Sequence, residues 1–71
     1  MRKKESERLI EAICAELRVG TLLCHGLMLE GSFESAKEAQ HDSGERVAAL
    51  TEELIGAILA EAEETLERRW L

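Results

Sequence analysis

Two stretches of the sequence hold residue types that could do chemistry. The first is Cys24-His25, a thiol beside an imidazole, and both groups are common metal ligands. Adjacent side chains on a helix point about 100° apart, so this pair does not converge on one ion. Cys14 lies ten residues before Cys24, about 15 Å along a helix, which is too far for a disulfide. We therefore interpret the cysteines as small buried apolar residues and His25 as a boundary residue between two apolar faces.

The second stretch runs from Glu38 to His41 and has the spacing E-x-x-H, with Glu34 one helical turn earlier. Such pairs from facing helices bind two iron or manganese ions in ferritin-like carboxylate bundles, and a homodimer would duplicate the motif. The motif lies beside an expected turn, however, and the last helix carries its glutamates on its polar side. Glu34, Glu38 and His41 are candidate metal ligands for an alternative function, a metal-binding bundle. Our main expectation is a protein with no bound metal and no other cofactor.

Nothing in the sequence assembles a catalytic set. Ser32, Ser35 and Ser43 occupy capping or turn positions, where local hydrogen bonds account for them. The glycines fit no phosphate-binding pattern. A chain of 71 residues also leaves little room for a substrate pocket, which typically measures ~300–1,000 Å³. We therefore predict no catalytic residues and a protein that is not an enzyme.

Size and charge limit how the chain is stabilised and what it binds. A domain of 71 residues buries only about 60% of its unfolded surface, so it needs disulfides, a metal or oligomerisation. The net charge of −6 disfavours nucleic acid as a partner. The apolar run Val19–Leu29 has 11 residues, fewer than the ~20 of a membrane span. With no signal peptide recognised, we expect a cytoplasmic protein with no membrane partner.

The chain reads as all-α, because it lacks proline and is rich in good helix formers. We predict one domain over residues 1–71, with helices at about 3–30 and about 43–70 and a turn at 41–44. Asp42-Ser43-Gly44-Glu45 has the spacing of a capping box at the start of the last helix. Gly31 follows the apolar run and predicts a kink or break, with a short helix at about 33–40. The alternative is a helix that continues through Gly31 without a break.

The first helix has two apolar faces, which is the basis for predicting a dimer. One face includes Leu9, Leu17 and Met28, and we expect it to pack against Leu54 and Ile58 of the last helix. A helix with two apolar faces must bury both, and a single neighbour in a hairpin covers only one. We therefore predict an antiparallel helical hairpin that dimerises into a bundle. The candidate interface residues are Ala15, Val19, Leu22, Gly26, Leu29, Phe33, Gly56 and Ala60.

These features together favour a small, acidic, non-enzymatic interaction protein. We expect a homodimeric regulator, adaptor or inhibitor whose partners are a second copy of itself and another protein. Binding would use apolar helix surface, read out at positions i, i+3, i+4 and i+7.

Overall fold

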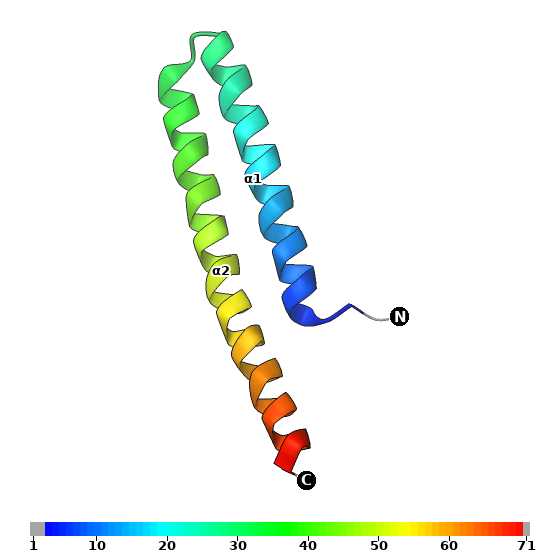
Figure 1. Cartoon of the computed structure of the whole chain (residues 1–71). Coiled ribbons are helices and arrows are strands. Elements are labelled where there is room, and N and C mark those ends of the chain that lie inside the picture. Colours follow the sequence, from blue (N-terminus) through cyan, green and yellow to red (C-terminus); the bar gives the residue numbers. More distant parts are fainter. Residues whose placement is uncertain (1–2, 71) are drawn as a thin grey trace.

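Two antiparallel helices make up the fold in the computed structural model, which describes residues 3–70. Helix α1 spans Glu5–Leu29 and helix α2 spans Phe33–Trp70. The helices run side by side, and the C-terminal part of α2 extends past the start of α1 (Figure 1). The predicted all-α helical hairpin is thus confirmed. Residues 1, 2 and 71, which the predicted domain includes, lie outside the described residues.

A glycine-containing turn at residues 30–32 reverses the chain. Gly31 has a φ of 81°, a left-handed conformation that glycine adopts without strain. The amide of Gly31 donates to the carbonyl of Met28 at 3.0 Å, and that of Ser32 donates to Leu27 at 2.9 Å. These two bonds form a Schellman motif, which satisfies carbonyls left free at the helix end. The change at Gly31 is therefore a full chain reversal, not a kink within a longer arm.

Helix α2 is unbroken, so the predicted turn at 41–44 and the separate short helix at 33–40 are wrong. Ser43, the second residue of the apparent capping box, is buried. It faces Gly20 of α1, where a Cβ would lie 3.0 Å from the Cβ of Ser43. A capping preference of about 1 kcal/mol does not outweigh continuous backbone hydrogen bonding and packing along α1. Helix α2 therefore has 38 residues against the 25 of α1.

The helices meet along a narrow seam in which small residues are interspersed with aliphatic ones and two glutamates. Its buried or half-buried positions recur every three or four residues, the spacing of a coiled-coil contact. They are Ser6, Leu9, Ile13, Glu16, Gly20, Cys24 and Leu27 of α1, and Ala36, Ala39, Ser43, Val47, Leu50, Leu54, Ala57 and Glu61 of α2. Ala12 and Thr51 are half-buried beside this series. Among the described residues only Leu9 and Ala36 are buried apolar residues. The hairpin, whose Cα atoms extend over 61 × 22 × 10 Å, therefore has very little core of its own.

Several large side chains expected inside the hairpin lie outside it. Leu17 is 50% exposed, Met28 56% and Ile58 47%, whereas Leu54 is half-buried as part of the seam. Because Gly20, Ala36 and Ser43 let the two helices approach closely, this part of the seam has no room for further bulky residues. The broad apolar face of each helix is thus only partly used for packing within one chain.

A carboxylate from α2 anchors the first turn of α1. Lys4, at the N-cap position, makes no capping bond with its side chain. Instead, the backbone amide and the hydroxyl of Ser6 donate to Glu61 Oε1, at 3.4 and 3.0 Å. A negative charge at a helix N-terminus is favourable because the first amides have no partner within the helix. Glu61 therefore replaces a local cap and holds the start of α1 against α2.

Substituting Glu61 with alanine should destabilise the hairpin by about 1 kcal/mol, since two hydrogen bonds to a half-exposed carboxylate are lost. Urea unfolding followed by circular dichroism measures the change. Glu63→Ala is the matched control, because Glu63 is exposed on the same helix. Equal stabilities of the two variants would contradict the anchoring role of Glu61.

Candidate interaction surface

The candidate metal ligands do not form a group. His41 Nε2 lies 3.0 Å from Oε1 of Glu45, one turn further along α2, and Glu34 lies 3.6 Å from Lys37 Nζ. Glu38 is exposed. Within residues 3–70, no set of three or more His, Cys, Asp or Glu side chains could hold a metal ion. The E-x-x-H spacing thus does not bring Glu38 and His41 into a common set of ligands.

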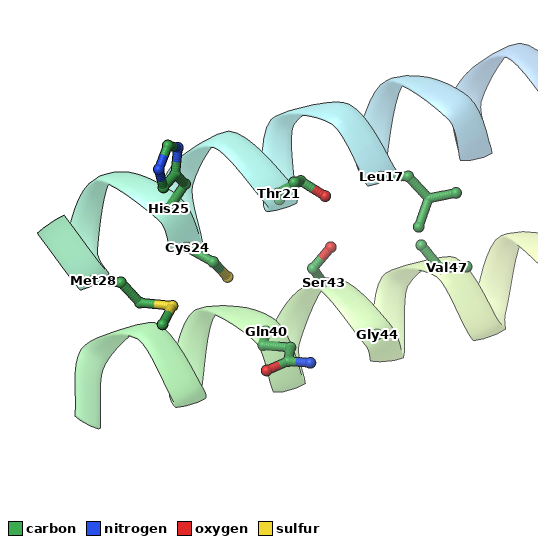
Figure 2. A pocket seen from close by; sticks show the side chains of 10 residues that line it. Leu17, Thr21, Cys24, His25, Met28, Gln40, Ser43, Gly44 and Val47 are labelled. Carbon is green, nitrogen blue, oxygen red and sulfur yellow. The ribbon is translucent and has the colours of Figure 1, made fainter. Parts of the chain in front are cut away.

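Cys24 and His25 are separated by the geometry of the helix. Cys24 is half-buried in the seam and its thiol donates to the carbonyl of Ala36 at 3.5 Å. His25 is exposed, and its ring points away from α2 (Figure 2). Cys14 is exposed rather than buried, which corrects the expectation for that residue. The exposure of Cys14 follows from its position beside, and not within, the seam.

All eight candidate interface residues are exposed within one chain. Five of them, Ala15, Val19, Leu22, Gly26 and Leu29, form one surface of α1, here called the α1 outer face. Leu22 is 65% exposed and Leu29 77%, and nothing lies within 4 Å of where a Cβ on Gly26 would be. This face therefore has apolar area and a site where another backbone can approach closely.

The other three candidates lie elsewhere on the hairpin. Phe33 opens α2 and is exposed there, so it does not extend the α1 outer face as it would on a continuous helix. It lies seven and fourteen residues before Gln40 and Val47, which places the three on one side of α2. Gly56 and Ala60 lie one turn apart on α2, away from α1.

A second surface, not foreseen from sequence, is hollowed. A groove of about 520 Å³ lies between the helices near the turn, lined from Leu17 to Met28 on α1 and from Gln40 to Val47 on α2. Leu17 and Val47 point toward each other across it, while Cys24 and Ser43 lie between the helices (Figure 2). Small residues line its centre, namely Gly20, Ser43 and Gly44. The groove exists because these residues do not fill the space between two closely packed helices.

The side of the hairpin that carries this groove has no charged residue over most of its length. Its members, here called the groove face, share the side of each helix that lines the groove, by their spacing of three, four or seven residues. Over residues 10–28 of α1 and 40–62 of α2 they include no lysine, arginine, aspartate or glutamate. They are Ile10, Leu17, Thr21, Cys24, His25 and Met28 of α1, and Gln40, Gly44, Val47, Thr51, Ile55, Ile58 and Ala62 of α2. In a chain that is 34% charged, such an uncharged surface across two helices is a candidate binding surface.

The opposite side of α2 is charged and binds α1 through an ion pair. Arg46 Nε lies 2.7 Å from Oε1 of Glu16, whose side chain is only 20% exposed. Asp42, Glu53 and Glu64 occupy the same side of α2 by their helical spacing. This contrast gives the hairpin one surface suited to apolar contact over both helices.

Helix α1 is also long and apolar enough to cross a membrane, judged by length and composition alone. An 18-residue window of it has a mean hydropathy of 1.4, and only 6% of that window is buried in the hairpin. The apolar segment found in the structure is longer than the 11-residue run Val19–Leu29 considered from sequence. It is longer because charged residues such as Glu16 and Arg18 are included when the average hydropathy is taken. Such a window also occurs in helices that pack against protein, so the observation is weak evidence for a span.

The chain matches no protein-family model, and neither the curated proteins nor the solved structures contain a match to it. Any functional conclusion therefore depends on the two apolar surfaces, the α1 outer face and the groove face.

Proposed function

We propose that this chain is a small non-enzymatic interaction module: a homodimer that binds a partner protein through apolar helix surface, as a regulator, adaptor or inhibitor does. The observation that carries the proposal is the excess of exposed large apolar side chains. Among the residues whose side chains the structure describes, twelve such side chains are 47% exposed or more, and Leu9 is the one large apolar side chain that is buried. A hairpin with so small a core is marginal alone, and association supplies the missing burial.

The α1 outer face is the surface we assign to the partner protein. Val19, Leu22, Gly26 and Leu29 follow one another at intervals of three, four and three residues. This is the spacing with which an amphipathic helix presents its anchors to an apolar groove or to another helix. Exposed Gly26 in the middle of the series lets a partner backbone come close. The matching partner surface is therefore apolar and elongated, about three helical turns in length.

A protein partner suits α1 better than a lipid bilayer does. Glu16 and Arg18 fall within the apolar part of α1, and Glu16 pairs with Arg46 of α2. Inserting α1 into a bilayer would break this ion pair and place charges in hydrocarbon, at a cost of several kcal/mol. Binding of a protein to the α1 outer face leaves the pair intact, since Glu16 lies in the seam.

Leu22→Asp tests this assignment. We expect the tagged variant to lose partner proteins that the parent chain retains from host extract, because the new carboxylate would be buried without a counter-ion. Ala49→Asp is the control, since it adds the same charge at an exposed position of α2 and should retain them. The measurement is quantitative mass spectrometry of the captured proteins.

Flotation with neutral phospholipid vesicles is run in parallel on the parent chain and on both variants. The proposal predicts that none of the three floats with the vesicles. Flotation of the parent that Leu22→Asp abolishes would overturn it in favour of a membrane-binding helix. Identical captured proteins for the parent and Leu22→Asp would also overturn it.

A further inference from the structure

We infer that a second copy of this chain occupies the groove face, in an antiparallel arrangement centred near Thr51. The inference rests on the proposed homodimer and adds which surface the second copy covers, in which direction and in which register. The second copy then covers the groove face and the partner protein covers the α1 outer face, so both can bind at the same time.

The groove face is complementary to itself. Its turn end is hollow beside Gly44, over the close contact between Gly20 and Ser43, and its other end carries the exposed side chains of Ile55 and Ile58. In a symmetric dimer the same surface of each copy contacts the other copy. The hollow and the ridge formed by Ile55 and Ile58 must therefore both lie on that surface, as they do on the groove face. Reversing the second copy puts its Ile58 over the Gly44 of the first, and the reverse contact follows by symmetry.

Two independent features give the same register. The first feature is the contact between Gly44 of one copy and Ile58 of the other. Residue 51 lies midway between these two residues, so this contact places residue 51 at the centre of the interface. Residue 51 also lies at the middle of α2, whose bounds Phe33–Trp70 place the midpoint between residues 51 and 52. Centred there, the two α2 helices are coextensive, and the end of each α2 that extends past α1 lies over the turn of the other copy. The product is a four-helix bundle about as long as α2, ~57 Å.

The charges along α2 agree with this contact. From Gln40 to Ala62 the groove-face positions of α2 carry no formal charge, whereas its opposite side carries Asp42, Arg46 and Glu53. Because α2 meets its own copy about residue 51, each uncharged position faces another uncharged position. A charged partner peptide would find no complementary group along this stretch.

The exposed area matches what a stable dimer buries. A compact chain of 7.9 kDa exposes about 4,400 Å², whereas this one exposes 6058 Å². The excess of roughly 1,600 Å² is about twice the ~800 Å² that each partner contributes to a standard interface, and it falls within the range of obligate homodimers. One further layer of two helices on the groove face accounts for an excess of this size.

Gly44→Leu and Gly56→Leu form the decisive pair of variants. Both glycines lie in α2, and a Cβ at either would meet nothing within 4 Å in one hairpin. Each position therefore has open space for the first side-chain carbon within one hairpin, and each substitution removes a helix-weakening glycine. Circular dichroism of each variant checks that the hairpin is still folded. Gly44→Leu fills the hollow that receives Ile58 of the second copy and should raise the dimer dissociation constant at least about tenfold. Gly56→Leu should leave it unchanged, since Gly56 lies outside the groove face.

Sedimentation equilibrium gives the dissociation constants. If Gly56→Leu weakens the dimer and Gly44→Leu does not, the inference is overturned. Equal dimer dissociation constants for the two variants would also overturn it. In both cases the homodimer itself would stand. A parent chain that sediments as a folded monomer would instead remove the homodimer on which the inference depends.

A disulfide test reports the register directly and does not require weakened association. In a chain carrying Cys14→Ser and Cys24→Ala, the variant Thr51→Cys should form a covalent dimer on air oxidation, because residue 51 of each copy faces its equivalent. Ala49→Cys, exposed on the other side of α2, should remain unlinked under the same conditions. Absence of the link at residue 51, or equal linking at both positions, would overturn the proposed register.

Discussion

Gly20→Leu should lower the free energy of unfolding by about 3 kcal/mol, the upper end of the cost of overfilling a packed contact. Gly20 is buried in the seam, and a Cβ there would meet the Oγ of Ser43 and lie 3.0 Å from its Cβ. A leucine side chain has no space between the helices at this point, so α1 and α2 must separate. The separation also disturbs the neighbouring contacts of the seam, on which this small fold depends.

Gly26→Leu is the matched control, because a Cβ at Gly26 meets nothing within 4 Å. That variant should be as stable as the parent or slightly more so, since leucine favours helix over glycine by roughly 0.5–1 kcal/mol. Thermal and urea unfolding of both variants, followed by circular dichroism, measure the difference. If the two variants unfold at the same denaturant concentration, the close approach of the helices at Gly20 does not hold in solution.

Dilution should destabilise the protein by a comparable amount. If folding and association are coupled, each tenfold fall in concentration lowers the free energy of unfolding of the dimer by about 1.4 kcal/mol. Over a thousandfold range this amounts to about 4 kcal/mol, a large share of the stability of any small fold. The physical reason is the thin seam, in which Leu9 and Ala36 are the buried apolar residues among those described.

The measurement is the thermal unfolding midpoint by circular dichroism at a series of protein concentrations. We expect the midpoint to fall steadily as the protein is diluted. A midpoint that does not change with concentration would show that the hairpin folds without a second copy. A cross-linked Thr51→Cys dimer provides the control, because its unfolding should not depend on concentration.

Sequence reasoning identified the helical hairpin, but it left open whether the helix breaks at Gly31 and placed the connection to the last helix at 41–44 instead of 30–32. Glycine after an apolar run ends a helix through one backbone conformation, and that conformation is present in the turn. The false turn at 41–44 came from an equally local signal, the capping pattern that starts at Asp42. There the preference of the cap is overridden by the packing of Ser43 against Gly20, a contact between residues 23 positions apart that local pattern does not reveal.

The candidate site was predicted only in part, for a related reason. Helical periodicity showed that α1 has too much apolar surface for one neighbour, which agrees with the exposure of Val19, Leu22 and Leu29. It did not show which apolar residues enter the seam, because the choice depends on how closely the helices approach. Glu16 and Glu61 were missed as seam residues since acidic side chains resemble a solvent-exposed face, although each binds a group on the other helix.

We propose that one chain is structurally incomplete and folds as part of a homodimer. Sedimentation equilibrium at micromolar concentration, on protein whose helix content is measured in the same buffer, tests it most directly. We expect a folded species with twice the 7.9 kDa mass of one chain. A fully helical species with the mass of a single chain would contradict it.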